Sequence, residues 1–524
     1  MKSIVSALSI IALGFGLLGC PGNGGSGDST PTFGVSTTAA DYGVVGNAYT
    51  STLAVSGGTG PFTWALLTGT LPTGTPPTDF VLTPATGVVS GTPTVAGNFT
   101  ATFTVTDNTG KTATGSVLFS IHPRTDRVSV DTNGTAGNGA STEPAISRTN
   151  GRFIAFTSLA TLAPTPNGSG TQIFVHDRQT GQPSLISVND VGDAGSGASS
   201  QPTISADGRY VAFTSVAPNL VSGSNGTQIF LRDTQSSTTI LVSQDTLGNA
   251  GNGASNQPTI SADGRYVAFT SLATTLAPTT NGSGTQVFVR DTQANTTTLV
   301  SQDAGGNAGN GASSQPTIST NGRYVAFTSA ATTLAPMLGG SGTQIFLRDT
   351  QGNTTVLVSQ GAGNGGNGAS SQPTISGDGL VVAFTSVSSN LTADPDPAPS
   401  QIFLRDTQLD TTTLVSQATG VGVAVGDGGS SQPTISADGR YVAFTSSATT
   451  LAPTPGGSGT QIFRRDTIGN TTILVSQDAG GNAGNGASST ASINSNGGFV
   501  AFSSAADFSL GATGPVDIYV RALP

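Results

Sequence analysis

The chain carries very little charge for its length. Of its 524 residues, 18 are Lys or Arg and 28 are Asp or Glu, so only 9 % are charged, against about 25 % in a typical globular protein. Glu143 is its one glutamate, and Lys111 is its one lysine beyond residue 30. The net charge of −10 leaves no basic patch that could displace counterions from a polyanion. We therefore expect no nucleic-acid partner.

Cysteine and histidine are nearly absent as well. Cys20 is the single cysteine, which excludes an intrachain disulfide. A base of the imidazole type could come only from His122, in the link between two predicted domains, or from His176, at a repeat position that holds arginine in other copies. No paired-carboxylate motif, phosphate-binding loop or zinc-ligand spacing occurs. The sequence thus predicts no catalytic residue, no metal site and no cofactor.

Glycine, serine, threonine and asparagine take the place of the missing charges. Glycine alone accounts for 73 residues, about twice its usual share of ~7 %. These residues favour strands and turns, so the composition disfavours an all-helical fold. The hydrophobic share of 35 % is nevertheless too high for a wholly disordered chain. The composition predicts an all-β protein.

The first residues predict export. A short positive start precedes an apolar run from Ile4 to Leu18, which suits a signal-peptide core better than a membrane-spanning helix of about 20 residues. The run ends in Leu17-Leu18-Gly19-Cys20, which resembles the bacterial lipobox. That resemblance implies cleavage before Cys20 and diacylation of its sulfur; the alternative is an ordinary secretory signal with an incidental cysteine.

The resemblance also implies a location in the cell. Pro21 stands where related lipoproteins retained at the inner membrane have Asp, so the outer membrane is favoured. We expect residues 1–19 to be a lipoprotein signal peptide and residues 20–30 to be a Gly/Ser-rich tether. The partner implied by Cys20 is the membrane itself, through the lipid anchor.

Residues 31–122 predict a small all-β sandwich. Apolar and polar residues alternate there, with turn clusters every eight to twelve positions. The stretches SGGTGPFTWAL (56–66) and TGVVSGTPTVAGNFTATFTVTDNTG (86–110) resemble the immunoglobulin-like, cadherin-like repeats of bacterial surface proteins. We expect Trp64 in the core; sugar stacking is the alternative. Asp107 and Asn108 fit a hairpin turn, with a calcium site between modules as the alternative.

The rest of the chain, residues 123–524, repeats one unit. The string PTISADGRYVAFTS recurs with small changes at a period of 56 to 60 residues, and its central isoleucine gives seven copies: Ile146, Ile204, Ile260, Ile318, Ile375, Ile435 and Ile493. Such a period indicates a solenoid or a propeller. Each copy contains four strand-like runs, which is the content of one propeller blade.

The two ends of this region favour a closed ring over an open stack. The last copy stops after its third strand, Asp517 to Arg521, and a run that matches the missing fourth strand, Arg127 to Asp131, stands before the first copy. A strand from the start that completes the last blade would remove both exposed sheet edges. The predicted fold is therefore an N-terminal Ig-like β-sandwich followed by a seven-bladed β-propeller closed by an N-terminal strand.

The units SADGRYVAFTS and TQIFLRDT resemble the TolB-like, WD-like repeats of periplasmic propeller proteins. The chain departs from that family in having seven copies where six blades are usual. It also departs before the third strand, where related repeats often carry Asp. Only Asp517 keeps that carboxylate, and the other copies have glutamine: Gln172, Gln228, Gln286, Gln344, Gln401 and Gln461. If the Asp binds calcium in relatives, six of the seven blades have lost the ligand.

An Arg-Asp pair ends the third strand in five copies. Adjacent strand residues point to opposite faces, so we expect each Arg to pair with another blade and each Asp to cap the following turn. These predicted structural residues are Arg232, Asp233, Arg290, Asp291, Arg348, Asp349, Arg405, Asp406, Arg465 and Asp466.

Strand direction predicts where a ligand would bind. The long links, such as residues 217–226 and 245–256, lie on one face and are nearly free of charge, which suits a protein or a neutral glycan. Asp394 and Asp396 are a poor metal site on their own, and Val421 to Val425 is an apolar segment for a partner or for the sandwich. We prefer a lipid-anchored binding or scaffold protein without enzymatic activity. The alternatives are a surface structural or adhesive protein and a polysaccharide hydrolase or lyase.

Overall fold

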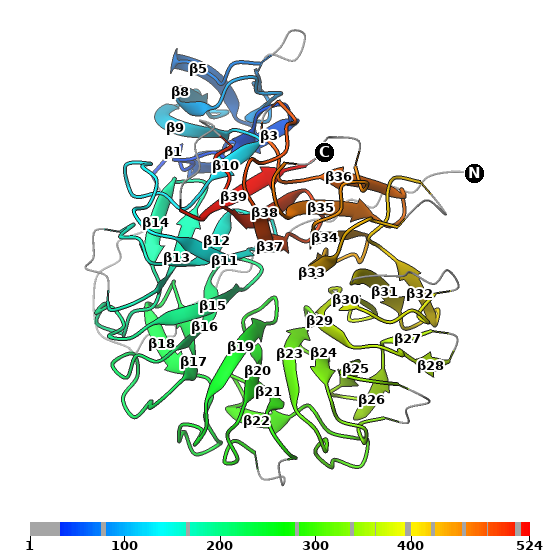
Figure 1. Cartoon of the computed structure of the whole chain (residues 1–524). Coiled ribbons are helices and arrows are strands. Elements are labelled where there is room, and N and C mark those ends of the chain that lie inside the picture. Colours follow the sequence, from blue (N-terminus) through cyan, green and yellow to red (C-terminus); the bar gives the residue numbers. More distant parts are fainter. Residues whose placement is uncertain are drawn as a thin grey trace, which may run out of the picture.

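The computed structural model describes residues 32–74, 80–163, 168–277, 282–335, 340–361, 363–392, 400–420, 425–452, 457–478, 480–508 and 515–523. Over these residues the chain forms strands and turns and no helix, as the composition predicted. Two parts are visible in Figure 1: a small strand-rich part at the top and a larger set of sheets below it.

The N-terminal part contains two main sheets and one short strand pair. The sheets have the orders β2-β9-β8-β5 and β3-β7-β6, and β1 pairs with β4. All neighbours are antiparallel except β2 and β9. The strands are β1 (Gly34–Val35), β2 (Gly43–Val44), β3 (Tyr49–Thr52), β4 (Val55–Ser56), β5 (Thr63–Gly69), β6 (Val81–Thr83), β7 (Val88–Gly91), β8 (Gly97–Thr106) and β9 (Thr112–His122).

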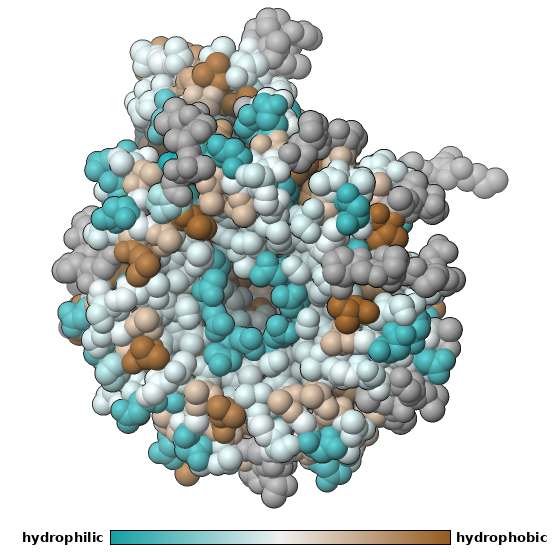
Figure 2. Space-filling view, in the orientation of Figure 1, coloured by the Kyte–Doolittle hydropathy of each residue, from teal (hydrophilic) through white to brown (hydrophobic). Residues whose placement is uncertain are grey.

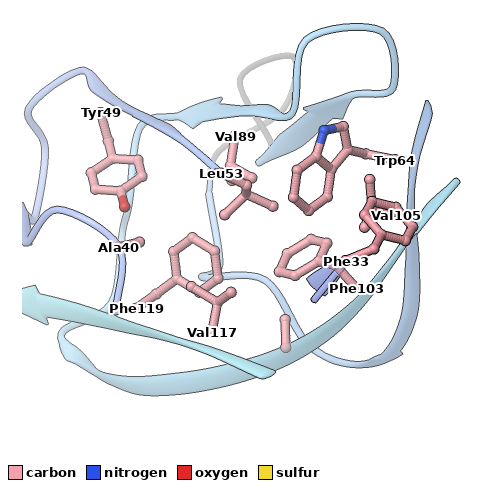
Figure 3. Close-up of a cluster of buried hydrophobic side chains, with 11 residues drawn as sticks. Phe33, Ala40, Tyr49, Leu53, Trp64, Val89, Phe103, Val105, Val117 and Phe119 are labelled. Atoms are coloured by element: carbon pink, nitrogen blue, oxygen red, sulfur yellow. The ribbon is translucent and has the colours of Figure 1, made fainter. Parts of the chain in front are cut away.

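The core of this part is aromatic and lies between the two sheets (Figure 3). Trp64 of β5 is 4 % exposed and packs in one cluster with Phe103, Phe119 and Leu53. The predicted core position of Trp64 is confirmed. Asp107 lies in the β8–β9 turn, where its Oδ1 accepts hydrogen bonds from the backbone N–H groups of Thr109 and Lys111 at 2.9 and 3.0 Å, so it acts in the turn.

The larger part is built from repeated four-stranded antiparallel sheets, an arrangement of the propeller type. Figure 1 shows them arranged radially around a common centre, with the first strand of each repeat innermost. We number the sheets 1 to 7 by their first strands. These are β11 (Ser141–Ile146), β15 (Ser199–Ile204), β19 (Ser255–Ile260), β23 (Ser313–Ile318), β29 (Ser370–Ile375), β33 (Ser430–Ile435) and β37 (Ser488–Ile493).

The other strands follow outward in chain order. The second strands are β12 (Phe153–Ser158), β16 (Tyr210–Ser215), β20 (Tyr266–Ser271), β24 (Tyr324–Ser329), β30 (Val381–Ser386), β34 (Tyr441–Ser446) and β38 (Phe499–Ser504). The third strands are β13 (Gln172–Asp177), β17 (Gln228–Asp233), β21 (Gln286–Asp291), β25 (Gln344–Asp349), β31 (Gln401–Asp406), β35 (Gln461–Asp466) and β39 (Asp517–Ala522). The outer strands of sheets 1 to 6 are β14 (Gln182–Leu185), β18 (Thr238–Leu241), β22 (Thr296–Leu299), β26 (Thr354–Leu357), β32 (Thr411–Leu414) and β36 (Thr471–Leu474). A short hairpin, β27 (Gln360–Gly361) and β28 (Asn364–Gly365), follows sheet 4.

Sheet 7 joins the two ends of this part. Its outer strand is β10 (Thr125–Arg127), which pairs antiparallel with β39. The paired residues begin two positions earlier than the predicted run from Arg127. The backbone N–H of Val128 continues the contact by donating to the carbonyl of Ile518 at 2.9 Å.

Neighbouring sheets pack face to face through aliphatic and aromatic side chains. One cluster, for example, joins Ile173 of sheet 1 with Val211, Phe213 and Phe230 of sheet 2, all at most 1 % exposed. Within sheet 2 the rings of Phe213 and Phe230 are stacked, with centroids 5.9 Å apart. The core is therefore divided into repeated layers between sheets, which follows from the apolar residues that each second and third strand presents on both of its faces.

The two parts of the chain meet around a buried arginine. Arg178, just after β13, has a fully buried side chain whose guanidinium lies 4.6 Å from the ring centre of Tyr42 and 5.0 Å from that of Phe499. His122, the last residue of β9, places Nδ1 2.7 Å from Asp126 Oδ2. These contacts tie the N-terminal part to sheets 1 and 7.

His176 is expected to make the folded protein less stable in acid. The side chain is 3 % exposed, and burial lowers its pKa to about 4, although Asp126 and Asp177 oppose that shift while Arg178 and His122 assist it. The unfolded chain, with an ordinary histidine pKa near 6.5, binds this proton first. Stability should therefore fall as the pH drops from about 6.5 to about 4, by roughly 2 to 3 kcal/mol.

Urea unfolding at pH 7 and pH 5 measures this dependence. The neutral His176→Gln variant should lose most of it, because the aspartates of the unfolded chain begin to take up protons only below about pH 5. An equal fall in stability in both proteins would assign the acid sensitivity to other groups.

Candidate functional site

The innermost strands enclose a cavity of about 340 Å³ at the centre of the sheets. Figure 2 shows this hollow, with hydrophilic side chains around its rim. Each sheet lines it with the third and fourth residues of its first strand. Five sheets contribute Gln-Pro, at Gln201, Gln257, Gln315, Gln372 and Gln432, whereas sheet 1 contributes Glu143-Pro144 and sheet 7 Thr490-Ala491. We call the residues at the first of these two positions the axial ring.

A repeated backbone irregularity points the axial ring inward. In every first strand the pairing to the second strand shifts register at this position, as between Ser200 and Thr203 in sheet 2. The ring residues have φ values between 47° and 55°, a left-handed conformation that costs a non-glycine residue energy and that concentrates at functional positions. The bulge turns each side chain toward the neighbouring sheet.

Hydrogen bonds link the axial ring from sheet to sheet. The backbone N–H of Gln257 donates to Gln201 Oε1 at 2.9 Å, and the same contact recurs from sheet 1 to sheet 7 at 2.7 to 3.3 Å. Each acceptor oxygen in sheets 1 to 6 also takes a hydrogen bond from a threonine hydroxyl of its own sheet, such as Thr214 on Gln201, at 2.8 to 3.2 Å.

These bonds decide which atoms face the cavity. Both lone pairs of each glutamine Oε1 are used, and a flipped amide would turn its Nε2 donor against the backbone N–H donor of the next sheet. The five Nε2 groups make no hydrogen bond to any residue that the structure describes, and the glutamines that carry them line the cavity. In sheet 1 the same two bonds are made by Glu143 Oε2, which leaves the second carboxylate oxygen of Glu143 for the cavity.

A second cavity, of about 1000 Å³, lies on the long-loop face of sheet 2. Residues 221–228, residues 248–254 and strand β18 contribute most of its lining, and none of the lining residues is charged. Glycine, asparagine, serine, threonine and glutamine predominate there. The loops that strand direction predicted for ligand binding thus enclose a groove, which we call the loop groove.

The five arginines of the predicted Arg-Asp pairs are buried, with exposures between 1 and 8 %. Four of them donate from Nη1 to backbone carbonyls in the connection that leaves the preceding sheet: Arg232 to Asn189, Arg290 to Asp245, Arg348 to Asp303 and Arg465 to Ala418, at 2.7 to 3.2 Å. The described partners of Arg405 are Thr412 and Asp410 of its own sheet.

The aspartates of these pairs have a partner that sequence reasoning missed. Asp233 Oδ1 accepts the backbone N–H of Gln235 at 2.9 Å, but both carboxylate oxygens also accept from Arg209, just before β16, at 2.6 and 2.9 Å. Asp291, Asp349 and Asp466 are held in the same way by Arg265, Arg323 and Arg440. Arg323 holds the pKa of Asp349 at about 2. In sheet 5, which contains Asp406, Leu380 occupies the position of this arginine.

The glutamines that replace Asp before the third strand form hydrogen bonds that stabilise their own sheets. Gln228, for example, accepts the hydroxyl of Ser243 at 2.6 Å and donates to the carbonyl of Gly251 at 3.1 Å. The one retained carboxylate, Asp517, accepts from Ser129 at 2.7 Å, and its Oδ2 lies 3.4 Å from Arg127 Nε. Burial raises the pKa of Asp517.

Several predicted features lie outside the described residues: Cys20, residues 1–31, Asp394, Asp396 and residues 421–424. In the part that is described, neither histidine forms a hydrogen bond to a Ser, Thr or Cys side chain. The described residues contain no group of three or more His, Cys, Asp or Glu side chains that could hold a metal ion. In the same stretches of chain, no helix has the length and apolar character needed to cross a membrane.

Comparison with known proteins leaves the family open. No family model matches the chain, and no curated protein matches it in sequence. Among solved structures, a protein described as a TolB from Agrobacterium tumefaciens is 15 % identical, with a TM-score of 0.34 over 53 % of this chain and 80 % of that one. A Pyrococcus horikoshii acylaminoacyl peptidase is 12 % identical, with a TM-score of 0.43 over 74 % of this chain and 52 % of that one.

Prolyl endopeptidases give a similar result, at 12 % identity and a TM-score of 0.43 over 74 % of this chain and 50 % of theirs. The chain thus spans about half the length of the peptidases it resembles. These structural similarities are too weak to support a conclusion about function. The evidence for the propeller-type arrangement is the strand order of the chain itself.

Proposed function

We propose that this chain is a binding protein of the bacterial cell envelope that recognises a neutral glycan in the loop groove. The observation that carries the proposal is the chemistry of the groove. Its volume, about 1000 Å³, is at the upper end of the range for small-ligand sites, and its lining offers neutral donors and acceptors without a charge. An uncharged, hydroxyl-rich ligand matches such a surface, whereas an ion would lose its hydration there without finding a counter-charge.

In this proposal the rest of the molecule connects the ligand-binding domain to the membrane. In this proposal sheets 1 to 7 are the blades of one seven-bladed propeller, closed by β10, and the N-terminal part is an Ig-like sandwich that serves as a spacer. The anchor is the lipid on Cys20 at the outer membrane. Because the groove has no aromatic lining residue, binding relies on hydrogen bonds, and its affinity should be modest.

A glycan array probed with the full chain in detergent micelles tests the proposal. We expect neutral oligosaccharides to bind and charged ones not to bind. The Asn225→Arg variant places a cation at the mouth of the groove on an exposed residue, and it should weaken binding roughly tenfold, as expected when about 1.4 kcal/mol is lost.

Asn133→Arg is the matched control, because Asn133 is equally exposed on a turn before sheet 1. It should bind like the unmodified chain. If no neutral glycan binds, the proposal fails and a structural or adhesive role takes its place. Hydrolysis of a bound glycan would instead identify the chain as an enzyme.

A further inference from the structure

The axial ring presents hydrogen-bond donors that have no acceptor among the described residues. Each of the five glutamines that line the cavity keeps its Nε2 group available, since every Oε1 is occupied by a backbone N–H and a threonine hydroxyl. Donors grouped in this way at a cavity attract oxygen atoms that accept hydrogen bonds, and an oxyanion most of all.

One position of the axial ring has the opposite character. Glu143 is the only glutamate of the chain, and it stands where five other sheets have glutamine. Its Oε2 reproduces the glutamine contacts, to the N–H of Gln201 at 2.7 Å and the hydroxyl of Thr157 at 2.8 Å. The substitution therefore leaves the ring intact and changes one group at the cavity from a donor to an acceptor with a negative charge.

The neighbouring position widens the cavity beside this carboxylate. Sheet 7 has Thr490-Ala491 in place of Gln-Pro, and the Thr490 hydroxyl is 2.6 Å from that of Ser503 in its own sheet. Sheets 7 and 1 are adjacent, so the shorter side chain leaves room next to Glu143. On the far side of the ring from Glu143 lie sheets 4 and 5, with Gln315 and Gln372.

We propose that the central cavity binds a small zwitterion, with its ammonium group at Glu143 and its oxyanion at the amides of Gln315 and Gln372. A simple oxyanion would meet the Glu143 carboxylate, and a simple cation would meet the inward N–H groups, so neither suits the whole ring. A molecule that carries both groups satisfies both sides. The volume of about 340 Å³ limits the ligand to the smallest class of pocket occupants.

This site is separate from the loop groove and does not depend on its ligand. Calorimetric titration of the full chain in detergent with ω-amino carboxylates of one to five methylene groups tests it directly. We expect saturable binding with a clear optimum of chain length. Acetate and methylammonium, which carry one charge each, should bind at least tenfold more weakly than the best zwitterion.

Two reciprocal substitutions use residues that the ring already accommodates. Glu143→Gln converts sheet 1 to the arrangement of sheets 2 to 6, so it should fold normally, lose zwitterion binding at least tenfold and gain binding of acetate and inorganic phosphate. Gln315→Glu copies the sheet 1 arrangement opposite Glu143 and should abolish oxyanion binding. Asn225→Arg, in the loop groove, should change neither.

Three results would overturn the proposal. The first is no saturable binding of any zwitterion at tens of millimolar, which would mean that the cavity holds water alone. The second is equal binding of acetate and its ω-amino counterparts. The third is zwitterion binding that survives Glu143→Gln unchanged.

Discussion

Replacing Arg348 by alanine is expected to lower the free energy of unfolding by about 4 kcal/mol, because each hydrogen bond from a charged group contributes roughly 1.5 to 3 kcal/mol. The side chain is 2 % exposed. Its Nη1 donates to Thr355 Oγ1 at 3.0 Å and to the carbonyl of Asp303, in the connection from the preceding sheet, at 3.1 Å. Alanine would remove this donor from both acceptors and open a cavity between sheets 3 and 4.

Arg323 is the matched control in the same sheet. It forms an ion pair with Asp349 at 2.6 Å, but its side chain is 37 % exposed, and exposed ion pairs contribute little to stability. We therefore expect Arg323→Ala to lower the melting temperature far less than Arg348→Ala. Differential scanning calorimetry of both variants decides the matter. Equal falls would mean that Arg348 has no special role in joining the sheets.

The repeat pattern was sufficient to predict the strands and their order. Alternation in Tyr-Val-Ala-Phe-Thr-Ser and the Ala-Asp-Gly turns reports local conformation, and seven copies of the same signal leave little ambiguity about it. The face on which the loop groove lies could be predicted for a related reason, because strand direction alone determines which links share a face. The groove itself and its volume were not predicted, since they depend on how two loops pack.

The axial ring escaped sequence reasoning for a physical reason. Its Gln-Pro dipeptide occurs in five of the seven copies, but the alternation of a regular strand does not predict the bulge that turns the glutamine inward. Gln201 adopts a left-handed conformation, with φ at 53°, although the usual sequence signal for it, a glycine or an asparagine, is absent. Glu143 was notable in the composition as the single glutamate, but its place at the central cavity could be recognised only from the structure of the axial ring.

The Arg209–Asp233 pair was missed because its members are 24 residues apart. Cross-strand pairing of β16 and β17 places Tyr210 opposite Asp233, so the preceding arginine can reach the carboxylate. A hint was available, since arginine follows the turn glycine in most copies. The copy with Leu380 keeps Asp406, however, and this exception weakens the covariation that would have revealed the pair.

Introducing aspartate at Val128 is expected to unfold the protein, because Val128 is a buried residue of the segment that joins the two ends of the repeat region. The side chain is fully buried and packs with Ile518, Val520 and Ile154. A carboxylate there would be unpaired in an apolar environment, at a cost of more than about 4 kcal/mol. We expect loss of the folded protein at 37 °C, measured by circular dichroism and limited proteolysis.

A comparison of Val128→Asp with the same substitution in another sheet tests whether the ring is closed. Val300 occupies the equivalent place in sheet 3, where its N–H donates to Val287 at 2.8 Å as that of Val128 does to Ile518. In a closed ring every sheet has two neighbours, so Val128→Asp and Val300→Asp should destabilise the protein equally, each in one cooperative transition. In an open stack the terminal substitution would only fray the last sheet, and Val128→Asp would leave the main transition near its original temperature. Val191→Asp, at a residue 83 % exposed, controls for the added charge and should unfold like the unmodified chain.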